Sequence, residues 1–394
     1  MDHSAISSLL PVYRRYDLAF ARGEGAWLWT TDGRRMLDFC SGIAVTGLGH
    51  AHPHLVAALT EQAGRLWHVS NLFHIPELQR LADRLVAATF AETVFVCNSG
   101  AEAIEGAIKT VRRHFWAKGA PERHRIVSFE GAFHGRTFAG VSAAGGKKLV
   151  EGLDPLLPGF DIVPFGDLDA VRAAIGPATA AIMVEPIQGE GGIRLRPAAF
   201  LQSLRALCDE HGLLLVLDEI QAGMGRTGTL LACEQVGVRP DIAAIAKGLG
   251  GGFPVGAFLA TAHAASGMTP GAHGSTFGGN PLASAVANAV LDVMLEGGFL
   301  ERVAERGRFL RARLDAIAAE HSDVIAEVRG LGLLAGIRLH RDSADFIKAL
   351  QGLGMVTAPA AEEVVRLLPP LTVTEDELGH GCDLIAAACR DHPR

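Results

Sequence analysis

Four short runs in this chain of 394 residues are apolar at consecutive positions. They are TVFVC (93–97), AAIMV (180–184), LLLVL (213–217) and DIAAIA (241–246). Strands that are apolar on both faces are typical of parallel sheets buried between two layers of helices. Longer helical patterns alternate with these runs, as in α/β proteins. We therefore predict an α/β fold with a mainly parallel sheet, in which ligands bind beyond the carboxyl ends of the strands.

The pattern changes after GNPLASA (279–285), and the chain exceeds the ~100–200 residues of a typical domain. From Ser284 to His321 it predicts one long amphipathic helix, which a hairpin-like run (323–339) follows. The first ~45 residues, with a predicted hairpin at 27–39, carry too little core to fold alone. We expect residues 50–285 to form a large domain and 286–394 a small α+β domain, on which residues 1–49 pack.

Charge and apolar patterning limit the partners of the chain. Lys and Arg total 36 against 43 Asp and Glu, so the net charge of −7 argues against nucleic acid or an anionic membrane as main partner. The longest apolar stretch (248–262) is shorter than the ~18 residues of a spanning helix, and the amino terminus lacks a signal-peptide core. We expect a cytoplasmic protein whose six cysteines, none in a C-x-x-C pair, are buried thiols.

Polar residues follow each of the four apolar runs. Ser99-Gly100 follows the first and opens a helix, which offers free N–H groups to an anion; the alternative is an ordinary N-cap serine. Glu185 follows the second run. Asp218 follows the third and needs a positive or proton-sharing partner; a helix cap or a metal ligand is the alternative.

Lys247 follows the fourth run, and it is the only one of six lysines that ends a predicted buried strand. Desolvation would favour its neutral, nucleophilic amine. An anion cradle, a buried carboxylate and a nucleophilic lysine together match the needs of pyridoxal phosphate, with its phosphate on the helix end and its pyridine nitrogen on Asp218.

Two further motifs are similar to a dinucleotide-binding pattern and to a metal site. Residues 330–335 fit the G-x-G-x-x-A dinucleotide pattern, but a strand follows rather than a helix, so we predict a tight turn. His50, His52 and His54 could suggest a metal, but a proline interrupts them and no carboxylate or thiol is suitably near in the sequence. We predict a polar loop and no metal site.

Seven longer motifs resemble those of the class III, fold type I aminotransferases, which depend on pyridoxal phosphate. In the family's order, from about residue 10 to the end of the chain, they are CSGIAVTGLGHAHP, CNSGAEA, AFHGRT, EPIQGEGG, LDEIQAGMGRTG, AKGLGGGFPVGA and GSTFGGNPLA. The resemblance implies a homodimer with shared active sites. It also implies a large domain with a seven-stranded sheet and a small domain built from both chain ends.

The resemblance also implies roles for individual residues. Lys247 would bond to the cofactor and move the proton between carbon atoms, with Asp218 on the pyridine nitrogen and Gln221 near the ring hydroxyl. The other implied cofactor contacts are Ser99, Gly100, Ala101, Phe133, His134, Glu185 and, from the other subunit, Thr276.

The implied substrate contacts are Arg136, Glu190, Ser275 and Arg366. Arg136 and Arg366 would bind carboxylates, although Arg136 alone would be interpreted as a solvated loop charge. Glu190 would mask Arg366 while the amino donor reacts and would swing away for the dicarboxylic acid. Glu362 and Glu363 precede Arg366 where a glycine-rich stretch is usual in the family; we expect both to face solvent, the alternative being that they perturb Arg366. Ile43 favours an acylated over a free ornithine.

The expected reaction is N2-acetyl-L-ornithine plus 2-oxoglutarate giving N-acetyl-L-glutamate 5-semialdehyde plus L-glutamate, a step of arginine biosynthesis. The alternatives within the class use succinylornithine, N-succinyl-diaminopimelate, ornithine or 4-aminobutyrate as donor. Two others lie outside it: a non-catalytic relative that keeps the fold as a binding protein, and a nicotinamide dehydrogenase.

Overall fold

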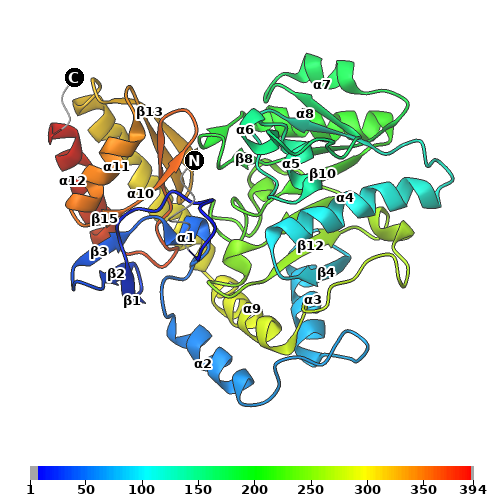
Figure 1. Cartoon of the computed structure of the whole chain (residues 1–394), viewed down its shortest axis with the longest axis horizontal. Coiled ribbons are helices and arrows are strands. Elements are labelled where there is room, and N and C mark those ends of the chain that lie inside the picture. Colours follow the sequence, from blue (N-terminus) through cyan, green and yellow to red (C-terminus); the bar gives the residue numbers. More distant parts are fainter. Residues whose placement is uncertain (1–7, 392–394) are drawn as a thin grey trace.

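The computed structural model describes residues 8–391 and is built around a seven-stranded sheet (Figure 1). β10 pairs in parallel with β7 and β11, whereas β12 is antiparallel to both its neighbours. The mainly parallel α/β sheet that we predicted is therefore confirmed. In spatial order its strands are β4 (Thr93–Cys97), β12 (Gly256–Ala260), β11 (Ile242–Ile245), β10 (Leu214–Asp218), β7 (Thr179–Val184), β5 (Arg125–Phe129) and β6 (Phe160–Val163).

The central strands face two helix layers with alternate residues. Leu214 and Val216 pack in a cluster with α4 (Gly100–Ala117), whereas Leu215 and Leu217 belong to a larger cluster that includes α8 (Ala198–His211). This explains the apolar residues at consecutive positions of these strands. The other helices of this part are α2 (Pro53–Ala63), α3 (Pro76–Ala88), α5 (Phe138–Ala144), α6 (Lys147–Val150), α7 (Leu168–Ala174), α9 (Pro281–Met294) and the short η1 (Ala232–Val236), η2 (Lys247–Leu249) and η3 (Ala264–Gly267).

Two four-stranded sheets bring the chain ends together. The first, in the order β1-β2-β3-β15, joins β1 (Phe20–Glu24), β2 (Trp27–Thr30), β3 (Arg35–Asp38) and β15 (Met355–Val356), with β3 parallel to β15. The second, in the order β13-β14-β17-β16, joins β13 (Ile325–Leu331), β14 (Leu334–Leu339), β17 (Val364–Leu367) and β16 (Ala358–Ala360). Both predicted hairpins, β2–β3 and β13–β14, are confirmed.

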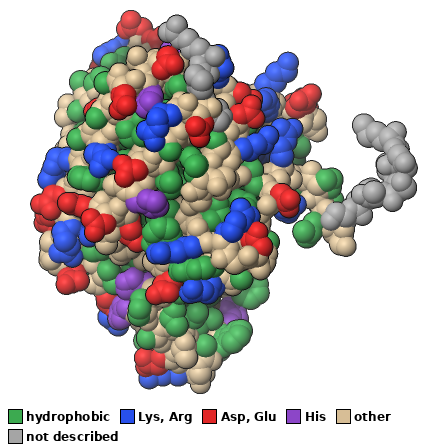
Figure 2. All heavy atoms as spheres, turned by 90° about the vertical axis from the view of Figure 1, so that its left-hand side faces the viewer, with side chains coloured by type: hydrophobic (Ala, Val, Ile, Leu, Met, Phe, Trp, Pro, Cys, Tyr) green, Lys and Arg blue, Asp and Glu red, His purple; other side chains and the backbone are tan. Residues whose placement is uncertain are grey.

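Three helices pack around these two sheets. α10 (Phe299–Glu320) contacts β13 and β14, α11 (Ser343–Gly352) contacts β15 and β16, and α12 (Glu375–Asp391) packs on α10 and α11. Figure 2 shows this side of the molecule, on which acidic and basic side chains are interspersed. The remaining elements are the turn α1 (Ser41–Ala44) and the small ribbon of β8 (Ile187–Gln188) and β9 (Arg194–Leu195).

The single long helix predicted over 284–321 was wrong, because α9 ends at Met294 and α10 begins at Phe299. The two helices meet at 70°. Gly297 and Gly298 lie at the break, and Gly298 has a φ of 82°, which a glycine adopts without the steric penalty of a side chain. Within residues 8–391 no single helix is long and apolar enough to span a membrane. Only α9 and α10 taken together, as a bent pair, reach the length and apolar composition of a spanning segment.

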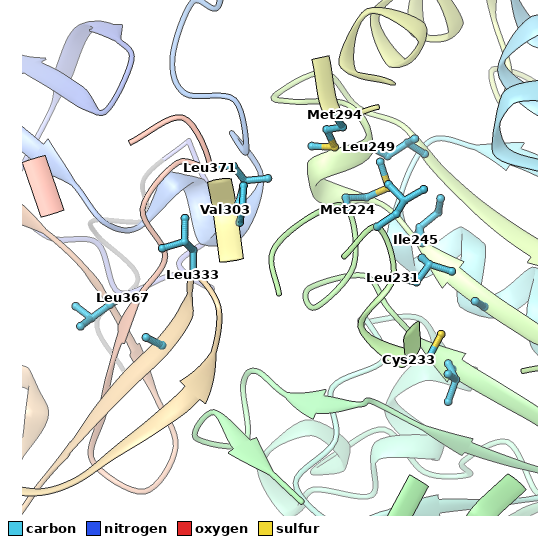
Figure 3. Packing of buried hydrophobic residues seen from close by; sticks show 14 of the residues in the cluster. Met224, Leu231, Cys233, Ile245, Leu249, Met294, Val303, Leu333, Leu367 and Leu371 are labelled. Atoms are coloured by element: carbon cyan, nitrogen blue, oxygen red, sulfur yellow. The ribbon is translucent and has the colours of Figure 1, made fainter. Parts of the chain in front are cut away.

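One hydrophobic cluster extends from the large sheet to the second four-stranded sheet. Figure 3 shows members from both parts, with Met224 and Leu249 on one side and Leu333 and Leu367 on the other. The loops that leave β10 and β11 are therefore packed continuously with the C-terminal strands. This packing places residues distant in sequence around one site.

Candidate active site

A cavity of about 490 Å³ lies where β4, β10 and β11 end. This is the position predicted for a ligand in a parallel sheet. Ten of the predicted residues line it: Ser99, Gly100, Ala101, Phe133, Arg136, Glu185, Glu190, Asp218, Gln221 and Lys247.

Asp218 is the last residue of β10 and is 4% exposed. Its Oδ2 lies 2.7 Å from Nδ1 of the buried His134, and its Oδ1 accepts a hydrogen bond of 3.1 Å from the Ile220 N–H. Burial lowers the pKa of His134, but the hydrogen bond and charge of Asp218 outweigh it, and the pKa is raised overall. His134 can thus balance the buried charge of Asp218, which is the partner that the sequence required without identifying.

His134 also carries an unsatisfied atom. Its Nε2 is buried and has no hydrogen-bond partner among residues 8–391. We conclude that His134 contacts the site through Asp218, because Nδ1 is committed to that carboxylate.

Lys247 follows β11, the strand beside β10. Burial lowers the pKa of its amine to about 8, although the charge of Glu190 opposes the shift. Lys247 also has a φ of 44°, a left-handed conformation that is uncommon outside glycine and that is concentrated at functional sites. The neutral fraction of this amine near neutral pH is therefore much larger than that of an ordinary lysine.

The amino end of α4 forms the third side of the cavity. Ser99 is its N-cap, and its Oγ accepts a hydrogen bond of 3.2 Å from the Glu102 N–H. The Glu102 carboxylate in turn accepts the N–H of Asn98, the residue before the N-cap, at 2.6 Å. The ordinary N-cap role left open for Ser99 is thus present, while the first N–H groups of the helix remain available to an anion.

Glycine is required at the start of this helix. A Cβ on Gly100 would lie 2.8 Å from Cδ1 of Ile220, two residues after Asp218. A Cβ on Gly135 would lie 3.0 Å from Cβ of Ala101, and Gly135 has a φ of 96°. The helix end is therefore packed closely against the side chain of Ile220 and against the loop at Gly135.

Glu190 lines the cavity and forms an ion pair with Arg366, which is not itself a lining residue. Arg366 lies on β17 and is 1% exposed. Its Nη1 and Nη2 donate to the two carboxylate oxygens of Glu190 at 2.5 and 3.1 Å. Nη1 also donates to Oε1 of Gln221 at 3.3 Å, and Nε donates to the Pro359 carbonyl at 3.0 Å. The predicted masking partner therefore occupies the carboxylate-binding face of this arginine.

Glu185 holds two loops of the cavity wall. Its carboxylate accepts the N–H groups of Phe133 at 2.7 Å and Gly189 at 3.2 Å. Burial, followed by the charge of Asp218, raises the pKa of Glu185 to about 7. Arg136, by contrast, is exposed, and its guanidinium carbon lies 5.6 Å from the ring centroid of Phe133.

Ser275 and Thr276 do not line this cavity. They lie in a separate hollow of about 370 Å³, together with Asn98 and Glu102. Ser275 Oγ accepts hydrogen bonds from Nδ2 of Asn98 at 3.1 Å and from the Gly278 N–H at 3.0 Å. The structure thus leaves these two predicted residues outside the cavity of their own chain.

Glu362 and Glu363 are exposed, and they contact groups other than Arg366. Glu362 lies 2.6 Å from Nη1 of Arg329, and Glu363 accepts the Ser343 N–H at 2.9 Å. Both have a positive φ. Solvent exposure is confirmed, and the described structure shows no hydrogen bond from either residue to Arg366.

Several lining residues were not predicted. They are Val45, Asn98, Gly135, Ile220, Ala246, Gly252, Phe253, Pro254 and Val255. Most stand inside the quoted motifs, so proximity to Lys247 or Asp218 in the sequence was the available signal. Val45 follows a turn, Ser41 to Ala44, in which four successive residues have a φ between 48° and 64°. Oδ1 of Asp38 caps this turn by accepting the N–H groups of Cys40 and Ser41.

The remaining sequence candidates have other contacts. His50 is bonded to Asp38 and His54 to Asp292, at 2.7 and 2.9 Å. No set of three potential metal ligands occurs in the described part of the chain. All six cysteines are free, and five of them are buried.

These residues fit pyridoxal phosphate. The helix end at Ser99–Ala101 lines the cavity and can take the phosphate, because the first N–H groups of a helix have no partner within it. The buried Asp218 faces the same cavity as the amine of Lys247. An anion site, an acceptor for a pyridine nitrogen and a nucleophile therefore converge as this cofactor requires.

Comparisons with known proteins agree over nearly the whole chain. A family model described as aminotransferase class-III matches residues 12–389. Acetylornithine aminotransferase 1 of Bradyrhizobium diazoefficiens is 57% identical over 389 residues, 99% of this chain and 96% of the relative. The acetylornithine aminotransferase of Rhodobacter capsulatus is 57% identical over 383 residues, 97% of this chain and 98% of the relative.

Solved structures are also similar over nearly the whole chain. The N-acetylornithine aminotransferase of Stenotrophomonas maltophilia K279a has a TM-score of 0.84 and 42% identity, with 96% of each chain covered. The ornithine aminotransferase of Toxoplasma gondii ME49 has a TM-score of 0.94 and 31% identity, covering 98% of this chain and 93% of its own.

Proposed function

Because this chain belongs to the class III aminotransferase family, we propose that it transfers the δ-amino group of N2-acetyl-L-ornithine to 2-oxoglutarate. The products are N-acetyl-L-glutamate 5-semialdehyde and L-glutamate, and the step belongs to arginine biosynthesis. The observation that carries the reaction class is the meeting of Lys247, Asp218 and the Arg366–Glu190 pair around one cavity. The donor rests on relatives at 54–57% identity that bear the name acetylornithine aminotransferase.

The cofactor of this reaction would be pyridoxal phosphate, which when bound supplies the electron sink for amino-group transfer. The α4 end at Ser99–Ala101 would hold its phosphate, Phe133 would lie on its ring, and Gln221 would lie near its hydroxyl. Asp218 would accept a hydrogen bond from the ring nitrogen, and its pairing with His134 fixes the orientation of the carboxylate.

Lys247 would bond to the cofactor and then act as the base. Its amine would take a proton from one carbon atom, that of the substrate, and return it to a second carbon atom. Its lowered pKa supports this role, because a base works best when its pKa lies near the working pH.

Arg136 and Arg366 would divide the binding of carboxylates. Arg136 would bind the carboxylate of the amino donor, while Glu190 keeps Arg366 paired. When 2-oxoglutarate enters, its second carboxylate would replace Glu190 on the guanidinium, which is suited to two parallel hydrogen bonds. One cavity would thus accept substrates with one or with two free carboxylates.

The position of Ser275 and Thr276 outside the cavity of their own chain supports a homodimer with shared sites. In such a dimer Thr276 would contact the cofactor phosphate of the partner subunit. We also propose a cytoplasmic location and a division into residues 1–49, 50–285 and 286–394, the first segment packing on the last. The pairing of β3 with β15 supports that packing.

A visible-absorption titration tests the donor. The purified protein with bound cofactor is titrated with acetylornithine, ornithine and 4-aminobutyrate in turn, without 2-oxoglutarate. Acetylornithine should convert the cofactor spectrum at far lower concentration than the other two donors. If another donor is preferred, the pathway is different; if no donor changes the spectrum, the proposed activity is wrong.

A further inference from the structure

Arg226 is a buried arginine outside the cavity. It lies in the turn-rich segment between β10 and η1 and is 2% exposed. No carboxylate lies within 4.0 Å of its guanidinium in residues 8–391. Burial lowers its pKa to about 10, with the charge of Asp38 acting in the opposite direction. Burying a cation costs several kcal/mol unless hydrogen bonds compensate it, so its contacts indicate its role.

The guanidinium of Arg226 joins two neighbouring strands of the second sheet. Its Nη1 donates to the carbonyl of Leu333 at 3.3 Å, in the turn between β13 and β14. The same atom donates to the carbonyl of Pro369, three residues after Arg366. β14 and β17 pair with Gly336 opposite Arg366. A single nitrogen atom therefore anchors the turn that begins β14 and the segment that leaves β17.

The backbone of Arg226 is packed as closely as its side chain. Its carbonyl accepts the Leu333 N–H at 2.9 Å. A Cβ on Gly332 would lie 2.8 Å from that carbonyl oxygen, and Gly332 has a φ of 61°. Of the two glycines that formally match a dinucleotide motif, Gly332 is therefore explained by its close contact with Arg226, whereas Gly330 lies against the backbone of Leu334 and Ala335.

The segment that carries Arg226 also contacts Arg366 directly. Gln221, five residues earlier, accepts a hydrogen bond from Nη1 of Arg366. The segment begins at Asp218, so it links the end of β10 to Arg366 in two ways. Gln221 contacts the side chain of Arg366, and Arg226 contacts the main chain that follows β17, at Pro369.

We propose that Arg226 is a positioning residue for Arg366, holding its guanidinium where a dicarboxylate can bind. The proposal rests on the proposed function, in which Arg366 binds 2-oxoglutarate. Once a dicarboxylate replaces Glu190, Arg366 keeps only the hydrogen bonds to Gln221 and Pro359 within the described protein. Its position then depends on the backbone that Arg226 anchors. The amino donor, bound at Arg136, does not draw on this anchor.

Arg226→Lys tests the proposal, because lysine keeps the charge but not the planar group that reaches two carbonyls. The protein with bound cofactor is titrated calorimetrically with glutarate, a dicarboxylate that lacks a keto group and cannot react. Its rate with acetylornithine is measured separately in single turnovers. We expect glutarate to bind on the order of 10- to 100-fold more weakly, the usual cost of a misplaced binding group. The acetylornithine rate should stay within about threefold.

Arg306→Lys is the matched control. Arg306 donates from α10 to the carbonyl of Leu371 at 2.8 Å, two residues after Pro369, and the described part of the chain shows no hydrogen bond from its side chain to the loop after Asp218. It should leave both measurements within about threefold of the unmodified protein. Arg226→Gln, which removes the buried charge, replaces Arg226→Lys if that variant does not fold.

Three outcomes would overturn the proposal: unchanged glutarate affinity in the Arg226 variant, an equal loss of glutarate affinity and acetylornithine rate, or an equal effect in Arg306→Lys. Failure of the proposed function is distinguishable. If the unmodified protein does not react with acetylornithine, yet its affinity for glutarate falls in the Arg226 variant, the donor assignment fails and the positioning role stands. If it reacts with acetylornithine but does not bind glutarate, the positioning role fails and the donor assignment stands.

Discussion

Glu190 places both carboxylate oxygens on the guanidinium of Arg366, at 2.5 and 3.1 Å, so a protein carboxylate occupies the position that a substrate carboxylate would take in the proposed reaction. In Glu190→Ala the arginine should attract the carboxylate of any donor. We expect the ratio of kcat/KM for acetylornithine over glutamate to fall about tenfold, equivalent to ~1.4 kcal/mol. Steady-state kinetics with each donor measures the ratio.

Glu362→Ala is the control for this change. Glu362 is an exposed glutamate of the same sheet that pairs with Arg329 rather than Arg366. Its loss should leave the ratio unchanged. Identical kinetics of both half-reactions in Glu190→Ala would show that Glu190 does not regulate access to Arg366.

The pKa of Lys247 predicts how the protein takes up its cofactor. Only the neutral amine can attack an aldehyde, and burial lowers the pKa of Lys247 from 10.5 to about 8. The rate at which cofactor-free protein captures pyridoxal phosphate should therefore rise with pH, reach half its maximum near pH 8 and level off above it. Stopped-flow absorbance measures this rate. A midpoint near 10.5 would show that Lys247 is not desolvated.

Two lysine variants complete that experiment. Lys247→Ala should lose covalent capture and transamination altogether. Lys348→Ala changes a lysine whose side chain is 68% exposed and should behave like the unmodified protein.

Asp218→Asn should retain the cofactor but react slowly. The amide keeps the size of the carboxylate and can still meet His134, but it cannot stabilise a protonated ring nitrogen. We expect single-turnover rates to fall at least ~100-fold, the scale of losing a preorganised charge. A loss of less than threefold would argue against contact between Asp218 and the ring.

The location of Thr276 outside its own cavity predicts complementation between inactive variants. If each site takes Lys247 from one subunit and Thr276 from the other, a mixed dimer of Lys247→Ala and Thr276→Ala contains one site with both residues intact. Mixing the two proteins under conditions of subunit exchange should raise activity above that of either alone. No gain, despite exchange verified by native mass spectrometry, would place Thr276 outside the shared site.

Gly256 supports the proposed phosphate site from behind. It begins β12, and a Cβ there would lie 2.5 Å from the carbonyl oxygen of Ser99. Gly256→Ala should displace the start of α4, cost ~1–3 kcal/mol of unfolding free energy and weaken cofactor affinity. Gly274→Ala, where nothing lies within 4 Å, is the control. Thermal unfolding and cofactor titration measure the two effects.

Three of the four strands that the sequence predicted, β7, β10 and β11, are buried throughout, whereas the fourth, β4, is an edge strand whose first three residues are exposed or half-buried. β5, β6 and β12 were not predicted individually. β6 is at the sheet edge, where Phe160 and Asp161 are half-buried and Ile162 is exposed, and β12 begins with glycine after a glycine-rich loop. Local pattern is weakest where tertiary packing decides the conformation. The pair Gly297-Gly298 in the sequence indicates the break before α10, but the amphipathic pattern on both sides of it led us to predict one continuous helix.

Within the site, residues that directly follow a buried strand were predictable, because the parallel topology collects them at one edge. The partner of Asp218 was not predictable by that rule, since His134 comes from a loop 84 residues earlier. The role of Gly332 was hidden in the same way, because its neighbour Arg226 is brought to it only by folding.

Asp218 ends β10 and Lys247 follows the adjacent strand β11, and the register of the two strands is set by three residue pairs, ending with Asp218 opposite Ala244. A slip of one residue would shift one strand by ~3.3 Å and turn its side chains to the other face of the sheet. Capture of the cofactor therefore reports correct strand alignment at the centre of the molecule. Recovery of the cofactor's colour during refolding would distinguish native chains from compact misaligned ones, even where both have the same helix content.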